Sequence, residues 1–426
     1  MKESKLLKEM FKFELWQEML DRATDKGVDL KIIKELCYPE NRAKLYKIIS
    51  EDKYNVFPPR ISRIPKDNGD FREVYINEPR DRVILSIIND CLFKLFPHYI
   101  HKNCVSYQKG KGTQEIVKNF SNEIVRLGIK NEHVGYKSDF SKFFDNLSIE
   151  VIDNLFDRIE KELGFAKNSE PVINILRRYY HQDLYFDVNG NLCERFQSLK
   201  QGCAISAWLS CAALYELDEF MSNKYSCYVR YSDDVVCVDE NTSEIINDMS
   251  RIIKPYGIKL NPKKVEPIYI DKWVKFLGFN IKGDMITLSR NRVKKFQKEI
   301  EKRSIKRKNC TSNQARRAII KYLYEGKFCW ASSCLRTINV EPDIQELNKF
   351  IMDCIRACET GKKKIGGLGS VNNLQDRTIL RGKGKNVKAN RSKTGYIENY
   401  LSVKCLSNNI KMNVTIFEAT VRNMKG

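Results

Sequence analysis

Two adjacent aspartates, Asp233 and Asp234, lie between β-branched and aromatic residues in the sequence VRYSDDVVCV. Neighbouring side chains of a strand point to opposite faces, so both carboxylates reach one locus only where the chain turns tightly. The pattern therefore predicts a β-hairpin with the pair at its tip. Carboxylates placed together in a chain of formal net charge +21 are costly to keep unless a cation binds them, and hard cations such as Mg²⁺ prefer oxygen ligands.

A site for two metal ions needs at least one further carboxylate. Asp139 in VGYKSDFSKFFDNL is the best candidate, because it ends a predicted strand whose apolar residues Val134 and Tyr136 would pack beside the hairpin. Two ions held by Asp139 and Asp233 would suit an in-line phosphoryl transfer. Taken alone, each Asp is more often a helix cap or a turn residue, but the joint pattern favours the metal site.

The balance of charged residues indicates a polyanionic partner. The 426 residues include 75 Lys and Arg against 54 Asp and Glu. Such an excess rewards binding to phosphates through charge attraction and counterion release. We therefore expect nucleic acid as the partner, and the alternative is a basic surface that is only solvated.

Composition also bounds the class of protein. A hydrophobic fraction of 42% supports a globular fold with a sizeable core. No run of about 18 apolar residues could span a bilayer, and the N-terminal MKESKLLKEMFKFE is too charged for a signal peptide, which predicts a cytoplasmic protein with no membrane partner. Fourteen cysteines without a CxxC pair, and four histidines, argue against a zinc site or a disulfide framework.

Hydrophobic periodicity and turn residues outline the elements that must position the carboxylates. Helices are expected over residues 1–51, 80–95 and 113–127, a basic hairpin over 60–64 and 71–76, a strand entering a helix over 134–147, and a second hairpin about Asp233. The Gly-bearing turn LKQGCAIS leads into a long apolar helix, residues 171–190 change from helix to loop, and a basic, mostly helical region follows Ser289.

The order of these motifs over roughly residues 58–285 resembles that of reverse transcriptases of the prokaryotic, group II intron-like lineage. The resemblance implies an α+β fold of the right-hand polymerase type, with fingers, palm and thumb. In that family a strand-ending Asp and a YxDD hairpin hold the metal ions, which here implies Asp139, Asp233 and Asp234 as ligands and catalytic residues, with the backbone carbonyl of Phe140. The implied cofactors are two Mg²⁺ ions, with Mn²⁺ as an alternative.

Other motifs of the family imply nucleotide-binding residues. Five positions after the first metal Asp, Phe144 stands where the family has the aromatic residue that stacks under the incoming sugar and favours dNTPs over NTPs. LKQGCAIS resembles the LPQG-type turn, so Gln201 and Gly202 would approach the nucleotide, the glycine without a Cβ in the way. Lys200 and Ala207 stand where the family usually has prolines.

Further motifs imply contacts to the triphosphate, the primer and the duplex. IPKDNGDFR resembles the fingers hairpin, in which Lys66 and Arg72 would hold the triphosphate. Lys264 in LNPKK fits the lysine that protonates the leaving pyrophosphate. FLGF resembles the primer grip, which implies Phe276, Leu277 and Gly278. The basic region after Ser289 would form a thumb helix whose implied nucleic-acid contacts are Arg292, Lys295, Lys302, Arg303 and Lys306.

The resemblance also divides the chain into parts. These are an N-terminal helical extension (1–51), fingers (52–135), palm (136–270, with a fingers insertion at about 165–200), primer grip (271–288), helical basic thumb (289–365) and basic C-terminal tail (366–426). The C-terminal part shows neither the clustered histidines of an HNH endonuclease nor the carboxylate set of an RNase H domain. This resembles the compact retron and defence-associated (unknown group) reverse transcriptases. The long thumb and tail, without a clear retron-type thumb motif, favour the defence-associated kind, with class 2 as a candidate within it.

The function implied is an RNA-directed DNA polymerase that copies a cognate structured noncoding RNA into cDNA from dNTPs, in antiviral (phage) defence. The RNA would serve as template, with a role as primer left open. The alternatives are a retron-type reverse transcriptase, a template-independent or protein-primed DNA polymerase, and an inactive nucleic-acid-binding scaffold. The oligomeric state is left open.

Overall fold

The computed structural model describes residues 3–23, 27–65, 69–108, 112–194, 199–325 and 329–360. The chain divides into an N-terminal unit, residues 1–111 with 134–268, and a C-terminal unit, residues 112–133 with 269–426. The segment expected as fingers, 52–135, is therefore shared between the two units. Within the part that the structure describes, no helix is long and apolar enough to cross a bilayer.

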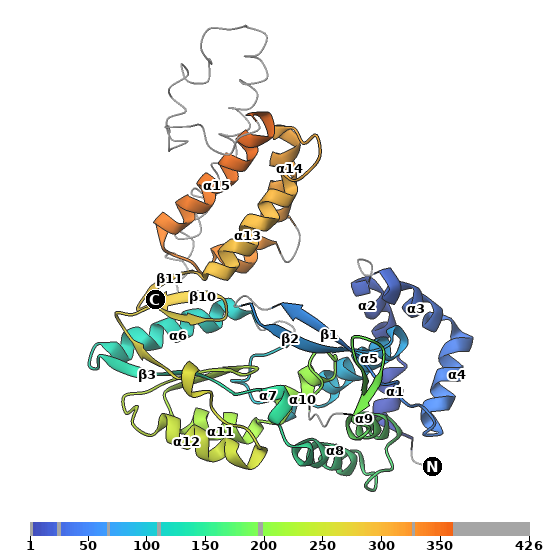
Figure 1. Ribbon diagram of the computed structural model, residues 1–426. Coiled ribbons are helices and arrows are strands. Elements are labelled where there is room, and N and C mark those ends of the chain that lie inside the picture. The colour runs from blue at the N-terminus through green and yellow to red at the C-terminus, as the bar shows by residue number, and fades with distance from the viewer. Residues whose placement is uncertain are drawn as a thin grey trace, which may run out of the picture. The chain divides into compact units, whose positions relative to one another are not determined.

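Five helices form one side of the N-terminal unit (Figure 1): α1 Lys5–Met10, α2 Phe13–Ala23, α3 Gly27–Cys37, α4 Pro39–Ser50 and α5 Pro79–Leu95. Helices α1, α2 and α3 pack against α5, while α4 packs against α3. Apolar residues of α5 recur at helical spacing, as at Val83, Ile87 and Cys91, and all three are buried. The same core continues through the unit as far as Ile258.

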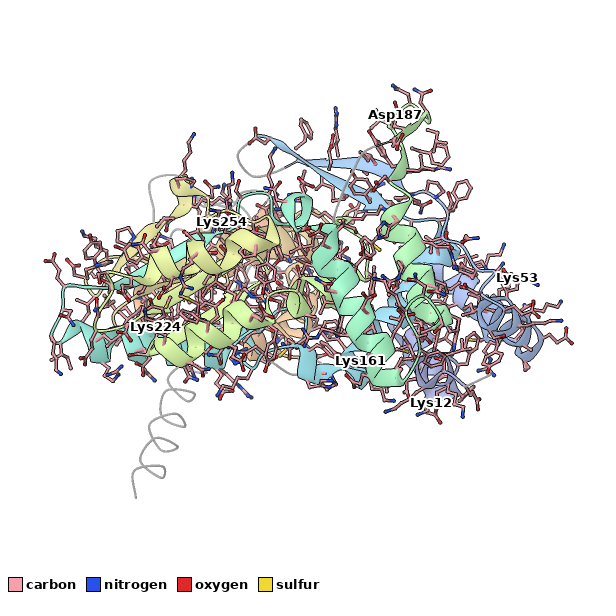
Figure 2. The ribbon with its side chains drawn as sticks, turned by 90° about the horizontal axis from the view of Figure 1, so that it is seen from below. Lys12, Lys53, Lys161, Asp187, Lys224 and Lys254 are labelled. Carbon is pink, nitrogen blue, oxygen red and sulfur yellow. The ribbon has the colours of Figure 1, made fainter. Side chains whose placement is uncertain are left out.

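A four-stranded sheet in the order β2-β1-β4-β5 lies beside these helices, with strands β1 Arg60–Pro65, β2 Phe71–Ile76, β4 Leu184–Phe186 and β5 Leu192–Glu194. The β1–β2 hairpin has the expected bounds within one residue. The β4–β5 hairpin is new, because the sequence predicted only a loop there. Asp187 lies at its tip (Figure 2) and accepts hydrogen bonds from the amides of Asn189 and Asn191, both at 2.8 Å.

The second sheet has the order β6-β7-β3-β8, with strands β6 Cys227–Tyr231, β7 Asp234–Val238, β3 His133–Asp139 and β8 Glu266–Tyr269. Helices α11 Tyr215–Lys224 and α12 Ile245–Ile253 lie together along this sheet (Figure 1). Strand β7 is internal to the sheet and buries the run Val235–Val238, which explains its continuous rather than alternating apolar pattern.

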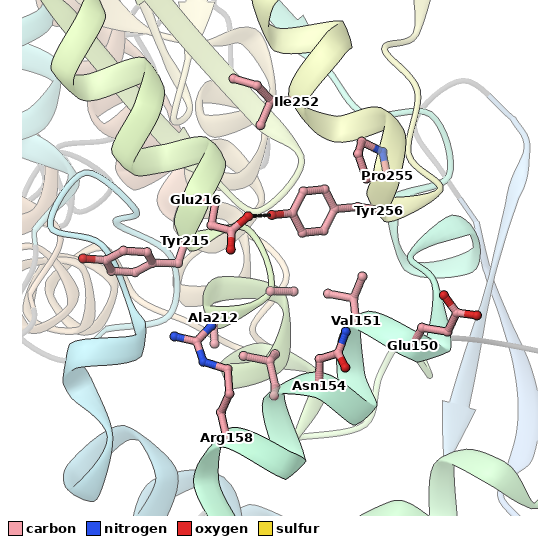
Figure 3. Close-up of a pocket in the computed structure, with 12 residues that line it drawn as sticks. Glu150, Val151, Asn154, Arg158, Ala212, Tyr215, Glu216, Ile252, Pro255 and Tyr256 are labelled. Carbon is pink, nitrogen blue, oxygen red and sulfur yellow. Dashed lines mark hydrogen bonds between the residues drawn. The ribbon is translucent and has the colours of Figure 1, made fainter. Parts of the chain in front are cut away.

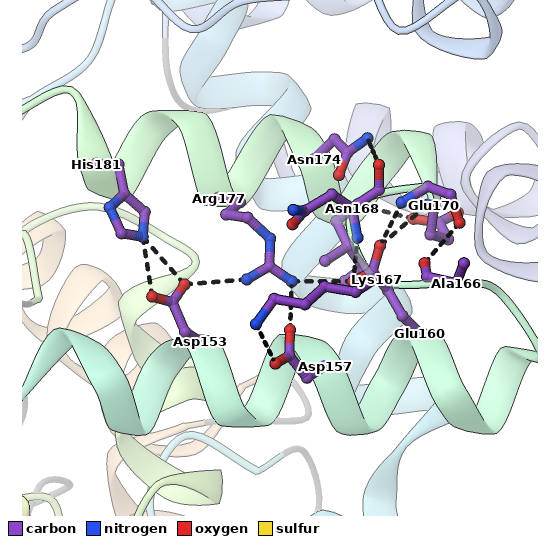
Figure 4. A network of polar contacts seen from close by, with 12 residues as sticks. Asp153, Asp157, Glu160, Ala166, Lys167, Asn168, Glu170, Asn174, Arg177 and His181 are labelled. Atoms are coloured by element: carbon purple, nitrogen blue, oxygen red, sulfur yellow. Dashed lines mark hydrogen bonds and ion pairs between the residues drawn. The ribbon is translucent and has the colours of Figure 1, made fainter.

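The remaining helices of the unit are η1 Pro97–Tyr99, α7 Phe143–Asn146, α8 Ile149–Leu163, α9 Pro171–His181, α10 Ser206–Ala212, η2 Lys254–Tyr256 and η3 Pro262–Lys264. Polar contacts join α8 to α9 (Figure 4). The fully buried Glu160 of α8 accepts hydrogen bonds from the amides of Asn168, Ser169 and Glu170 and pairs with Arg177 at 2.9 Å. These partners compensate the burial of its charge.

The C-terminal unit contains α6 Thr113–Gly128, strands β9 Val274–Phe276, β10 Phe279–Lys282 and β11 Met285–Leu288, and then α13 Arg290–Arg303, α14 Ser312–Tyr324, the π-helix η4 Ala331–Leu335 and α15 Glu341–Thr360. Helix α6 packs on the sheet, where Phe120 meets Phe276 with ring centroids 5.5 Å apart and Ser121 Oγ donates to Gly283 O at 2.6 Å. Helices α13 and α14 both pack against α15.

Candidate active site

The two adjacent aspartates lie at a tight turn between β6 and β7. Tyr231 pairs with Asp234, which leaves Ser232 and Asp233 as the two turn residues. Ser232 has a φ of +58°, a left-handed value that is uncommon for residues other than glycine. Its amide donates to Ser106 Oγ at 2.6 Å, and Tyr107 Oη donates to its side chain at 3.4 Å. These bonds hold the strained turn that presents the carboxylates.

The third carboxylate lies on the neighbouring strand. Asp139 ends β3 and pairs directly with Asp234 in the antiparallel ladder, so the two side chains share one face of the sheet. The amide of Phe140 donates to Asp233 O at 3.2 Å, which carries the contact past the end of the strand. Asp139 is 7% exposed. The fold thus brings Asp139, Asp233 and Asp234 to one end of the sheet.

Lysine side chains neutralise part of this charge. Lys264 Nζ donates to Asp139 Oδ2 at 2.8 Å, and Lys137 Nζ lies 3.9 Å from Asp234 Oδ1. Burial raises the pKa of Asp233, and the negative charges of Asp139 and Asp234 raise it further, against a lowering by Lys264. Burial lowers the pKa of Lys264, but its hydrogen bond to Asp139 and the surrounding carboxylates outweigh this and raise it overall.

The donor set fits a divalent cation by its chemistry. Three carboxylates and the carbonyl of Phe140 offer the oxygen ligands that Mg²⁺ prefers, and a cation would relieve the repulsion that raises the pKa of Asp233. Among the described residues, however, no group of three or more His, Cys, Asp or Glu side chains is already gathered closely enough to hold an ion. The charge of Asp139 is met by Lys264 instead.

A buried ion pair that the sequence analysis missed lies under the hairpin. Arg230 and Asp218 are both fully buried and form a bidentate pair, with Nε to Oδ1 at 2.7 Å and Nη2 to Oδ2 at 2.6 Å. Arg230 also donates to Ser210 O, Cys211 O and, at 3.3 Å, Ser232 O in the turn. The sequence contained a signal for this burial, because side chains alternate along β6 and Arg230 therefore points to the same buried side as Tyr228.

The residues expected to contact the sugar and template form a connected group. Phe144 lies in α7, half-buried against the core, and its carbonyl accepts a hydrogen bond from Leu199 N at 2.9 Å. Two positions on, Gln201 O accepts from Tyr75 N in β2 at 2.7 Å. Gly202 has a φ of +98°, and a Cβ there would lie 3.1 Å from Tyr75 O. The position therefore requires glycine for both conformation and space.

One of the two expected triphosphate ligands lies in strand β2. Arg72 is exposed on β2, where it pairs across the ladder with Ile64. Lys66 lies outside the described residues.

The expected primer grip and basic helix meet within the C-terminal unit. Phe276 is buried, whereas Leu277 and Gly278 form the β9–β10 turn with φ values of +48° and +79°. A Cβ on Gly278 would lie 2.4 Å from Arg292 Nε, and the Arg292 guanidinium lies 4.3 Å from the Phe279 ring centroid. Arg292 is thus part of the support for this turn.

The other expected nucleic-acid residues of α13 and its end differ in exposure. Lys295 and Lys302 are exposed. Arg303 pairs with Glu299 and lies 4.1 Å from the Tyr322 ring centroid, and Lys306 pairs with Glu301 at 2.7 Å. Lys306 is exposed as well, so Lys295, Lys302 and Lys306 are better placed than the partly buried Arg303 to meet phosphates.

A cavity of about 320 Å³ lies elsewhere in the N-terminal unit, between α8, α11 and η2. Figure 3 shows Tyr256 joined to Glu216 at its edge, a hydrogen bond of 2.7 Å, with Arg158 on the opposite side. None of the expected site residues lines it. The chemistry of the aspartate cluster is therefore separate from this cavity.

Together, a hairpin tip with two aspartates, a third aspartate on the neighbouring strand and a paired lysine form one carboxylate cluster at the end of the sheet. Residues 64–281 match the family model of reverse transcriptase (RNA-dependent DNA polymerase). This match covers more than half of the 426-residue chain. The chain belongs to the reverse transcriptase family.

Curated relatives are distant. The COX1/OXI3 intron 2 protein of Saccharomyces cerevisiae is 22% identical, with 56% of this chain and 34% of that protein covered. The retron Ec48 reverse transcriptase of Escherichia coli is 20% identical, with 56% of each chain covered. The chain thus spans between about a third and somewhat over half of the length of these two relatives.

Solved structures with a similar course of the chain include two telomerases. Apo telomerase from Candida tropicalis has a TM-score of 0.45 and 13% identity, covering 90% of this chain and 71% of that one. Telomerase from Candida albicans in complex with the TWJ fragment of telomeric RNA has a TM-score of 0.44 and 14% identity, covering 88% and 68%.

Proposed function

We propose that this protein is an RNA-directed DNA polymerase that copies a structured noncoding RNA into cDNA. The observation that carries the proposal is the pairing of Asp139 with Asp234 across β3 and β7, beside Asp233 in the turn. Membership of the reverse transcriptase family gives this carboxylate group its chemical context. The net charge of +21 supports a nucleic-acid substrate.

In this proposal Asp139, Asp233, Asp234 and the Phe140 carbonyl hold two Mg²⁺ ions, or Mn²⁺ in their place. When bound, the ions activate the primer hydroxyl and neutralise the departing pyrophosphate. Lys264, whose pKa is raised by its hydrogen bond to Asp139 and by the surrounding carboxylates in spite of its partial burial, would donate a proton to the leaving pyrophosphate. Phe144 excludes the 2′-hydroxyl, Gln201 and Gly202 border the template base, and Lys66 with Arg72 holds the triphosphate.

The proposal keeps the division into fingers, palm and thumb. The β1–β2 hairpin serves as fingers, the sheet β6-β7-β3-β8 as palm, the β9–β10 turn as primer grip and α13 with its exposed lysines as thumb. The N-terminal helices and the tail from 366 are accessory parts. Basic side chains of α13 would add affinity that does not depend on sequence.

The biological use that we propose is antiviral defence in the cytoplasm, with the RNA as template and cDNA as product. The support is the sequence resemblance to defence-associated reverse transcriptases. A retron-type enzyme is the second candidate, and the specific observation in its favour is the retron Ec48 reverse transcriptase among the relatives.

One experiment tests the proposal. The protein is purified from cells that carry its native genomic flanks, the co-purifying nucleic acid is sequenced, and Mg²⁺ with labelled dNTPs is added. Asp233→Asn removes one carboxylate charge, and Glu219→Gln on the exposed surface of α11 is the matched control. We expect cDNA complementary to one abundant structured RNA from wild type and control, and none from Asp233→Asn.

Other outcomes identify the alternatives. Bound RNA without DNA synthesis supports the inactive scaffold. DNA without relation to the bound RNA supports a template-independent polymerase, and DNA that stays attached to protein after denaturation supports protein priming.

A further inference from the structure

Lys200 is a lysine in the interior of the N-terminal unit. Lys200 is only 2% exposed to solvent, although lysine is rarely buried without a partner. Burial lowers the pKa of Lys200 to about 8, while Cys203 and Asp183 act in the opposite direction. The ammonium group therefore stays mostly charged at neutral pH, and the fold must compensate that charge.

Helix α9 supplies the compensation. Lys200 Nζ donates to Tyr179 O at 2.6 Å and lies 4.3 Å and 5.5 Å from the ring centroids of Tyr179 and Tyr180. Tyr179 lies in the last turn of α9, where carbonyls lack partners within the helix and the helix dipole is negative. The two aromatic faces add cation–π attraction. Lys200 thus caps the C-terminal end of α9.

The backbone around Lys200 connects this cap to the candidate nucleotide site. The Lys200 carbonyl accepts from Cys203 N at 3.0 Å and Ser206 Oγ at 2.9 Å. Leu199 N donates to Phe144 O, and Gln201 O accepts from Tyr75 N. Residues 199–201 therefore join three elements: α7, which carries Phe144, strand β2 of the hairpin, and α9. Of these three joining residues, Lys200 alone has a charged side chain.

We propose that Lys200 is a positioning residue for nucleotide selection. By fastening residues 199–202 to the end of α9, it sets the separation between Phe144 and Gln201, which the proposed function assigns to the sugar and the template base. Lys200 does not touch the nucleotide. It acts through the hydrogen bonds of Leu199 and Gln201, and the inference rests on the proposed polymerase function.

A kinetic experiment tests the effect on selection. Lys200→Met keeps much of the apolar stem and removes the charge, Lys200→Arg keeps the charge, and Lys161→Met changes an exposed lysine of α8 (Figure 2). With a homopolymeric RNA template and a DNA primer, we expect Lys200→Met to raise KM for dNTP about tenfold and to narrow the dNTP over rNTP preference about tenfold, with kcat changed by less than about threefold. Lys200→Arg should keep most of the wild-type KM and sugar preference, and Lys161→Met should match wild type in both.

A second measurement does not depend on activity. Hydrogen exchange reports the amides of Tyr75 and Leu199, whose acceptors are Gln201 O and Phe144 O. In Lys200→Met we expect faster exchange at both, with exchange in α8 unchanged. If Lys200→Met does not fold, Lys200→Gln, which is neutral but retains a donor, takes its place in both measurements.

The outcomes separate the two proposals. If the wild-type protein incorporates no dNTP on any template, the polymerase function is refuted. Hydrogen exchange at the amides of Tyr75 and Leu199 then tests only whether Lys200 holds residues 199–202 in place. Active wild type with unchanged KM, sugar preference and exchange in Lys200→Met overturns the role of Lys200. Failure of both neutral variants to fold, with an active Lys200→Arg, also overturns it, because Lys200 would then serve folding only.

Discussion

Lys264 donates to Asp139 across 125 positions of sequence, with Nζ 2.8 Å from Oδ2. Asp139 is one of the proposed ion ligands, so a cation bound at this carboxylate would compete with the Lys264 ammonium group for it. The ion pair offsets part of the cost of burying the Asp139 side chain, which is 7% exposed.

Replacement of Asp233 by Asn should abolish DNA synthesis without loss of folding. The change removes an oxygen charge from the proposed ion site, and we expect a loss of at least about a thousandfold in kcat/KM. Because repulsion from Asp139 and Asp234 contributes to the raised pKa of Asp233, the variant should unfold at the same temperature as wild type or higher. Primer extension and thermal unfolding measure the two effects, and Glu219→Gln is the control. Extension at the wild-type rate would remove Asp233 from the site.

Replacement of Phe144 by Ala should weaken discrimination against ribonucleotides. The ring is half-buried, and its loss opens space for a 2′-hydroxyl, so we expect the dNTP over rNTP ratio of kcat/KM to fall roughly tenfold to hundredfold. Phe144→Tyr keeps a ring and should retain most of the ratio. Incorporation of matched dNTP and rNTP pairs gives the ratio, and an unchanged value in Phe144→Ala would assign the exclusion to another residue.

Breaking the buried ion pair under the hairpin should cost stability. Arg230→Met leaves Asp218 buried without its charge partner, and we expect a loss of about 3–5 kcal/mol in the free energy of unfolding. The double variant Arg230→Met with Asp218→Asn should recover part of that loss, because the uncompensated charge is gone. Urea unfolding followed by circular dichroism measures both, and equal losses in the single and double variants would contradict this account.

Stability should fall as pH rises through about 7 because of Glu170. Burial, with a smaller contribution from the charge of Glu160, raises the pKa of Glu170 to about 7 against the lowering by hydrogen bonds from Ser4 and Ile173. Since the folded pKa exceeds the ordinary glutamate value of 4.5, the favourable contribution to the free energy of unfolding is complete below pH 4.5 and is lost as pH rises through the folded pKa.

Glu170→Gln should remove this dependence. We expect the variant to lose less stability than wild type between pH 5 and 8, by up to about 3 kcal/mol. Urea midpoints across that range, with Glu219→Gln as the control, measure the difference. Parallel curves for Glu170→Gln and wild type would show that Glu170 does not ionise in this window.

Local patterns are enough to predict much of the candidate site. The hairpin about Asp233, the strand that ends at Asp139 and the β1–β2 hairpin follow from alternation and turn residues, which depend on neighbours a few positions away. The β4–β5 hairpin escaped prediction because its strands have three residues each, too few for alternation to register. The family motifs placed Phe144 and Gln201 in the sequence, but they did not say what joins these two residues.

Contacts between distant segments are decided only when the chain packs. The strand order β6-β7-β3-β8 makes Asp139 the partner of Asp234, and no local pattern specifies which strand lies next to which. The same holds for Lys264 with Asp139, for Arg230 with Asp218 and for Lys200 with the end of α9. In each case a charge is buried at a cost that only a particular partner from another element can offset, so the residue types alone could not reveal the pairing.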